Sequence, residues 1–207
     1  MNELIQKILA DTKATEYQLY LTASEDKTAF RKQVYPEYKA NRKSPKPVHY
    51  LALREFLTEE YETEVISEIE ADDAIGIAQD KFGSTIICSI DKDLDMIPGL
   101  HYNFVKEIMY SVTDYQGIYN FYTQCLTGDT ADNVKGVSGI GKKKAESILY
   151  EATTEQEMFD RVRKAYDNDQ EFLINGEVLW IMRLPMQRWS LTTFGSQLLS
   201  EGERRPE

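Results

Sequence analysis

The chain has 207 residues, a formal net charge of −11 and 42% hydrophobic residues. This length can bury a substantial core, and the hydrophobic share argues against general disorder. A run of about 18 apolar residues is absent, and Met1 is not followed by a basic and then apolar leader, so we expect neither export nor membrane insertion but a cytoplasmic protein. Cys88 and Cys125 lie far apart in apolar stretches without metal-type spacing, which predicts reduced thiols.

The negative net charge does not exclude nucleic acid, because the basic residues are clustered. Between residues 26 and 46, seven basic side chains stand against two acids, and Lys135 with Lys142, Lys143 and Lys144 forms a second basic group. Lys and Arg supply most of the affinity for phosphates. The charge pattern therefore predicts two candidate surfaces for a polyanion.

The first half of the chain predicts an α/β unit. Spacing and composition give helices near residues 4–9, 48–61 and 71–82, and strands at 17–22, 63–67 and 84–90. Residues 24–47 carry three prolines and no apolar period, so we expect an exposed excursion there. The apolar run at residues 86–90 indicates a strand buried on both faces, as in a mostly parallel sheet flanked by helices.

The second half of the chain predicts mainly helices. One or two strands are expected within residues 103–112, followed by helices at 114–126, after 139–141, at 154–166 and at 171–183. Trp180 and Trp189 have apolar neighbours and are expected in the core. The charged tail from residue 200 is expected to be disordered. His49 and His101 lack the spacing of metal ligands.

Seven acidic residues fall in three groups where predicted strands end or predicted helices begin. These groups are Glu70, Asp72 and Asp73; Asp91 and Asp93; and Asp129 and Asp132. Each group alone has a plain structural explanation, since acids stabilise the first turn of a helix and aspartates form turns. Gathered in one cleft, however, they would repel one another unless cations neutralised them. Oxygen ligands suit Mg²⁺, and a pair of such ions can activate water and stabilise the leaving oxygen of a phosphodiester.

These motifs occur in the order that is typical of one family. Tyr35-Pro-Glu-Tyr38-Lys39-Ala-Asn41-Arg42 is followed by the three acidic groups and by Gly136-Val-Ser-Gly139-Ile-Gly141-Lys142. Over residues 30–149 the chain resembles the 5′-3′ exonucleases of the flap-endonuclease superfamily, in particular bacteriophage members and the 5′-nuclease domains of bacterial DNA polymerases I. Five ordered motifs are much more specific than any one alone.

The resemblance implies a domain plan: a PIN-like α/β metal-binding core at residues 1–112 with a helical arch at about 27–60, a helix-three-turn-helix DNA-binding region at 113–166, and a C-terminal helix and tail at 167–207. It further implies that the seven acids hold two Mg²⁺ ions, for which Mn²⁺ could substitute. Lys39 and Arg42 would contact the scissile phosphate as catalytic residues.

The resemblance also implies where nucleic acid binds. Tyr38, Lys39, Arg42 and Lys43 would order a 5′ end in the arch, where Tyr35 and Tyr38 could stack on bases. The turn with Gly136, Gly139, Gly141, Lys142 and Lys143 would grip the duplex backbone, with K⁺ as a candidate ion there. The plain explanations are a solvated loop for the arch and an ordinary helix-helix turn for the glycines.

The chain departs from the family at its start. Relatives usually open with a strand of the type Leu-Ile-Asp-x-Asp, which has no counterpart here, and Glu25 or Asp26 stands where many relatives place another aspartate. A truncated product, a mis-set start and a split enzyme completed by an N-terminal partner peptide are the open alternatives. We accordingly expect weak or no activity from the isolated monomer.

The leading functional hypothesis is a Mg²⁺-dependent 5′-3′ exonuclease or flap endonuclease that acts on DNA with a 5′ end, nick or flap, and on RNA primers in RNA-DNA hybrids. The alternative is a catalytically impaired, structure-specific DNA-binding fragment or split-enzyme subunit. A third reading is an unrelated α/β protein with an acidic cation site and no affinity for nucleic acid.

Overall fold

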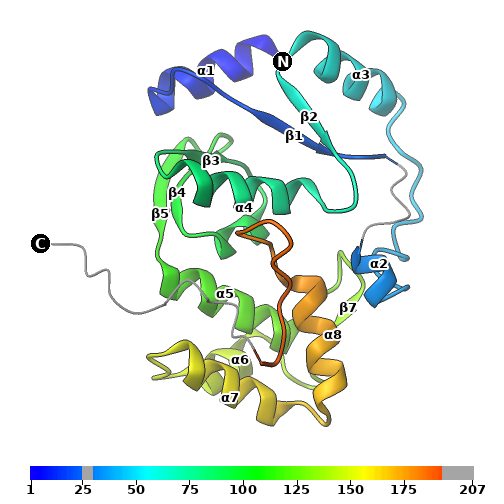
Figure 1. The fold of residues 1–207 in the computed structure, drawn as a ribbon, viewed down its shortest axis with the longest axis vertical. Coiled ribbons are helices and arrows are strands. Elements are labelled where there is room, and N and C mark those ends of the chain that lie inside the picture. The colour runs from blue at the N-terminus through cyan, green and yellow to red at the C-terminus, as the bar shows by residue number, and fades with distance from the viewer. Residues whose placement is uncertain (25–29, 193–207) are drawn as a thin grey trace, which may run out of the picture.

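The computed structural model describes residues 1–24 and 30–192, and it shows an α/β protein with a strand-rich part and a helical part (Figure 1). Its α-helices are α1 (Asn2–Thr12), α2 (Phe30–Val34), α3 (Tyr50–Glu60), α4 (Ala71–Phe82), α5 (Asp114–Thr127), α6 (Lys142–Leu149), α7 (Glu155–Ala165) and α8 (Asp169–Leu179). Its strands are β1 (Leu19–Thr22), β2 (Thr63–Ile66), β3 (Ile86–Cys88), β4 (Gly99–Asn103), β5 (Ile108–Val112), β6 (Gly128–Asp129) and β7 (Val134–Lys135), and the short 3₁₀-helix η1 spans Lys92–Met96. No helix within these described residues is long and apolar enough to cross a membrane.

The strands form three small sheets instead of the single, mostly parallel sheet that the sequence predicts. β1 pairs with β2 in parallel and β3 pairs with β4 in parallel, whereas β4–β5 and β6–β7 are antiparallel. The β4–β5 pair must be antiparallel, because a connection as short as residues 104–107 can only reverse the chain. Within the described residues, β1 and β3 belong to different sheets and do not pair, so the predicted mostly parallel sheet is not confirmed.

Helix α4 connects the two parallel units and carries part of the site. It contacts β1, β2 and β3, and its bounds coincide with the predicted helix. A capping box starts it: the side chains of Glu70 and Asp73 accept hydrogen bonds from each other's backbone N–H groups. Gly76 allows the segment around Met182 to approach the helix closely, since a Cβ atom there would lie 2.2 Å from the carbonyl oxygen of Met182.

The densest part of the core lies in the helical part, around α5. Helix α5 packs against α6, α7 and α8, and its Phe121, Tyr122, Cys125 and Leu126 are fully buried. Phe121 contacts the rings of both Trp180 and Trp189. The predicted core role of the two tryptophans is confirmed, although α8 ends at Leu179 and leaves Trp180 just outside the helix. Both cysteines carry free thiols, with Cys125 buried and Cys88 partly so.

The expectation that residues 24–47 form an exposed excursion is wrong for part of this segment. Residues 30–34 form α2, and the side chains of Arg31 and Tyr38 are 2% and 4% exposed. Local sequence gave no sign of this burial, because the groups that bind the two side chains come from distant parts of the chain. Residues 41–48 remain exposed, as expected. Glu25, Asp26 and the tail from residue 200 lie outside the described residues.

Candidate functional site

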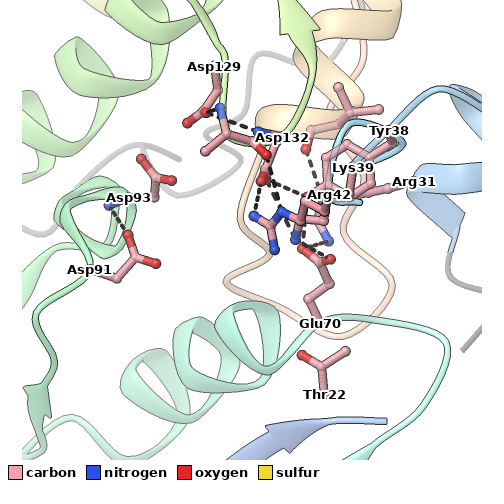
Figure 2. A network of polar contacts seen from close by, with 12 residues as sticks. Thr22, Arg31, Tyr38, Lys39, Arg42, Glu70, Asp91, Asp93, Asp129 and Asp132 are labelled. Carbon is pink, nitrogen blue, oxygen red and sulfur yellow. Dashed lines mark hydrogen bonds and ion pairs between the residues drawn. The ribbon is translucent and has the colours of Figure 1, made fainter. Parts of the chain in front are cut away.

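Three loops bring the predicted acidic residues to one side of the molecule, facing the segment that follows α2 (Figure 2). Glu70 stands at the N-terminus of α4, Asp91 and Asp93 follow β3, and Asp129 and Asp132 follow α5. These acids lie at the ends of strands or helices, and the fold brings those ends together. Up to 62 residues separate the acids in sequence. The figure shows them in two groups.

The first group holds Glu70 and Asp132 together with side chains of residues 38–42. The hydroxyl of Tyr38 lies 2.9 Å from both Glu70 and Asp132 and shares its one proton between the two carboxylates. Lys39 Nζ lies 2.5 Å from Glu70 Oε1 and 3.6 Å from Asp132 Oδ2, and Arg42 Nη2 pairs with Asp132 Oδ1. Lys39 also adopts the left-handed conformation, with φ 58, and its backbone N–H donates to the Asp132 carbonyl. Such backbone strain in a residue other than glycine is frequent at functional sites.

The second group holds Asp91, Asp93 and Asp129. Asp91 caps η1 by accepting from the Asp93 N–H at 3.0 Å, and Asp129 Oδ1 accepts from the Ala131 N–H at 2.7 Å. Gln124 of α5 bridges the group, donating to Asp93 at 3.1 Å and to Asp129 at 2.8 Å. Gln124 was not predicted as a site residue; its signal in the sequence is its polarity among the buried apolar residues of α5.

Negative charge at Asp72, beside both groups, and in the second group is poorly balanced. Burial, and then Glu70 and Asp91, raise the pKa of Asp72 to about 6. Burial also raises the pKa of Asp93, although Lys92 lies 2.8 Å from its carboxylate and opposes the shift. Lys92, also missed in the sequence, is 78% exposed, so water screens its charge. The carboxylates therefore lie in a field that a bound cation would relieve.

Asp73 forms a buried ion pair with Arg31, whose Nη1 also lies 3.8 Å from Glu70 Oε2. Arg31 donates to the two carboxylate oxygens of Asp73 at 2.5 and 2.8 Å, and the backbone N–H groups of Met182 and Glu70 donate to them at 3.0 Å each. The Asp73 carboxylate is 0% exposed and has protein donors on both oxygens. The structure therefore does not place it as an open metal ligand, contrary to the sequence analysis. Arg31 occupies the Asp73 carboxylate, a role that the sequence did not predict.

Tyr38 is also placed differently from the expected base-stacking residue. Its ring packs in the core, its side chain is 4% exposed, and its hydroxyl is used by the carboxylates. A buried ring offers no free face to a base. Of the four predicted arch contacts, Lys39, Arg42 and Lys43 remain at least partly accessible.

The three glycines of the predicted hairpin have different structural roles. A Cβ atom on Gly136 would lie 2.3 Å from the backbone N of Gly128, so this glycine permits close packing of two chain segments. Gly139 has φ +71, which favours glycine. Gly141 has an ordinary φ and open space around it, directly before the exposed Lys142 and Lys143 of α6. A hollow of about 320 Å³ beside this turn is lined by residues that include Thr127, Thr130 and Lys135.

The donor chemistry of the acidic groups fits a hard divalent cation, since their free ligands are carboxylate oxygens. Within residues 1–24 and 30–192, however, no three His, Cys, Asp or Glu side chains converge closely enough to hold an ion as they stand. Direct coordination of one ion by three carboxylates would therefore require Asp72, Asp91, Asp93 and Asp129 to move closer together, or Glu70 and Asp132 to exchange their present partners.

Comparison with known proteins agrees with this architecture. The sequence profile of the family described as "5'-3' exonuclease, N-terminal resolvase-like domain" matches residues 1–120. The DNA polymerase I of Caldicellulosiruptor bescii is 32% identical over 172 residues, which cover 71% of this chain and 20% of that protein. The flap endonuclease Xni of Shewanella baltica is 29% identical over 140 residues, or 60% of this chain and 53% of that protein.

A solved structure gives the same result for the fold. The flap endonuclease of bacteriophage T5, in a pseudo-enzyme-product complex with DNA and metal ions, matches with a TM-score of 0.66 at 20% identity, over 88% of this chain and 79% of that chain. The two curated relatives above are longer than the matched region: the chain spans between about a fifth and about half of their length.

Proposed function

Because this chain belongs to the family of 5′-3′ exonuclease N-terminal, resolvase-like domains, we propose that it hydrolyses phosphodiester bonds at the 5′ ends of duplex or branched DNA with divalent metal ions. One observation carries the proposal: acids from three chain segments and the basic side chains of Lys39 and Arg42 face one another in one site. Carboxylates for metal and fixed positive charge for phosphate are the two components that this chemistry needs.

In this proposal, the metal is Mg²⁺, with two ions bound and Mn²⁺ as a substitute. Glu70, Asp72, Asp91, Asp93, Asp129 and Asp132 would hold the ions, directly or through water. Bound there, they would supply an activated water and stabilise the leaving oxygen. Asp73 keeps a structural role beside them, because Arg31 occupies its carboxylate.

Basic residues beside the carboxylates and at the start of α6 would bind and orient the nucleic acid. Lys39 and Arg42 lie beside the carboxylates and would hold the phosphate at the cleavage position. The exposed Lys142 and Lys143, with the first backbone N–H groups of α6, would bind the duplex backbone some distance away. Residues 1–112 would thus carry most of the metal ligands, and 113–166 would add Asp129, Asp132 and the duplex contact, with K⁺ a candidate ion at the turn of Gly139 and Gly141. RNA-DNA hybrids are a second candidate substrate.

The decisive experiment is a single-turnover cleavage assay on a 5′-flap duplex and a nicked duplex. The purified chain should cleave slowly with Mg²⁺ and not with EDTA, while Asp91→Asn or Asp129→Asn should abolish cleavage and retain DNA binding. Asp80→Asn on the exposed side of α4 is the matched control and should cleave as the unmodified chain does. Cleavage that survives both Asp91→Asn and Asp129→Asn would refute the assignment.

One observation favours a second candidate function, structure-specific DNA binding without cleavage. The described acids do not form a ready metal site, whereas the basic surfaces are exposed. In that case the chain would bind branched DNA in a salt-dependent manner without metal-dependent cleavage, and a partner peptide would have to restore activity. Absence of any DNA binding would contradict both functions.

A further inference from the structure

Positive charge is distributed unevenly over the two groups of acids (Figure 2). Glu70 and Asp132 have two cationic partners from the segment after α2, namely Lys39 and Arg42. The Lys39–Glu70 pair is largely shielded from water, with side-chain exposures of 20% and 13%. Shielded ion pairs are screened less than exposed ones. One part of the site therefore already holds its counter-charge, and it comes from the protein.

The same two cations are those that the proposed function assigns to the substrate phosphate. A carboxylate oxygen that bonds an ammonium group is not free for a metal ion, and a lysine paired with a carboxylate is not free for phosphate. A metal ion and a phosphate would thus each compete with the Lys39–Glu70 and Arg42–Asp132 pairs. When metal and phosphate bind together, in contrast, the metal neutralises the carboxylates and the phosphate pairs with the two cations, so no charge is left unpaired.

We infer that Lys39 and Arg42 act as an internal counter-ion that occupies the Glu70–Asp132 part of the metal site and leaves it when a DNA phosphate takes both side chains. This inference rests on the proposed function. Its consequence is cooperativity: metal weakens the hold of the carboxylates on the two cations, and phosphate removes the cations from the carboxylates. By linkage, each ligand raises the affinity of the protein for the other by the same factor.

The local geometry suits a reversible exchange. The Lys39 ammonium ends a flexible stem, and the Arg42 side chain is 52% exposed, so both can turn outward. The Tyr38 hydroxyl bonds Glu70 and Asp132 at 2.9 Å each and does not depend on either cation. The two carboxylates would therefore keep one shared hydrogen-bond donor between them when the cations leave.

The test measures Mn²⁺ binding to the full chain in the absence of DNA, by electron paramagnetic resonance of the free ion. Lys39→Met removes the competing charge and should tighten Mn²⁺ binding roughly three- to tenfold, as expected for loss of one or two partly shielded ion pairs. Lys7→Met is the matched control, because Lys7 also bridges two carboxylates, Asp11 at 2.7 Å and Glu107 at 3.1 Å, but on α1 away from the site. Its Mn²⁺ affinity should stay unchanged.

A second pair of variants guards against a folding defect. Arg42→Met should also tighten Mn²⁺ binding, and Lys39→Arg, which keeps the charge, should bind as the unmodified chain does. Unchanged or weaker binding by Lys39→Met and Arg42→Met, with intact circular dichroism, would overturn the inference. The proposed function has a separate readout, which is cleavage by the unmodified chain. Cleavage by the unmodified chain together with unaltered metal affinity in the variants sinks the inference alone, and tighter metal binding in the variants of a chain that never cleaves sinks the function alone.

Discussion

At the scale of single residues, Asp72 shows that burial and neighbouring acids disfavour negative charge in the site. It is partly buried beside Glu70 and Asp91, and its pKa is raised from 3.8 to about 6. Because the folded pKa is above the unfolded value, the ionised form costs stability. The cost is absent below pH 3.8, grows as the pH rises towards 6, and is complete above it.

The first prediction follows from this shift. In metal-free protein, Asp72→Asn should raise the free energy of unfolding at pH 8 by up to about 3 kcal/mol and leave it unchanged near pH 3.5. Urea denaturation at the two pH values measures it, with Asp80→Asn as an exposed control on the same helix. A gain that is equal at both pH values would show that Asp72 is not held under electrostatic stress.

Residue roles were the part of the site that the sequence predicted least well. Glu70, Asp91, Asp93, Asp129 and Asp132 do face one site, as their places at element ends suggested. The expected open roles of Asp73 and Tyr38 do not fit their burial, because that burial depends on Arg31 and on carboxylates from other elements. A residue's type limits what it can bind, but its partners decide whether it is free to do so.

At the scale of elements, local sequence patterns predicted the structure well. Helix α4 has the predicted bounds because a capping box starts it and Gly83 ends it, and both are local features. Helix α2 escaped prediction because a helix of five residues carries too little periodicity to be seen. Helix α3 was predicted, yet none of its residues is buried, so a helical period does not guarantee a packed face.

The turn before α6 offers a prediction at this scale. Gly141 has no backbone need for glycine and nothing near the place of a Cβ atom, so Gly141→Ala should leave the melting temperature unchanged. If a phosphate approaches this turn, the added methyl group should weaken duplex binding severalfold by obstructing the backbone N–H groups. Fluorescence anisotropy with a labelled duplex measures it.

Gly136→Ala is the contrasting variant for this experiment. Its Cβ atom would meet the backbone of Gly128 at 2.3 Å, so it should unfold at lower temperature for reasons of packing alone. Unaltered DNA affinity in Gly141→Ala would speak against a phosphate contact at this turn.

At the scale of the whole molecule, the Arg31–Asp73 pair joins three distant parts of the chain. Arg31 comes from α2 and Asp73 from α4, and Arg31 also donates to the carbonyl oxygens of Val178 and Trp180 at 2.9 and 2.6 Å. The pair therefore ties the base of the basic segment to the core beside the acids. A buried ion pair of this kind contributes little by its presence but is costly to break.

Arg31→Met should consequently lower the free energy of unfolding by about 3–5 kcal/mol, because it leaves a buried carboxylate without its partner. Equilibrium urea denaturation measures the loss, and Lys43→Met, an exposed charge in the same segment, should change stability by less than about 0.5 kcal/mol. Combining Arg31→Met with Asp73→Asn should recover part of the loss. A double variant that is no more stable than Arg31→Met would argue against an unpaired charge as the cause.

The sequence by itself determined the approximate positions of the longer helices and of several strands, the core tryptophans, the family motifs and the chain positions at which the acids occur. Those features depend on periodicity, caps and residue type, which are local. Only the tertiary structure decided that the strands form separate small sheets, that Arg31 takes the carboxylate of Asp73, and that Lys39 and Arg42 cover Glu70 and Asp132. The ion pairs among these outcomes join residues 31 to 90 positions apart, where charge and hydrogen bonding are balanced across elements and no local pattern records the result.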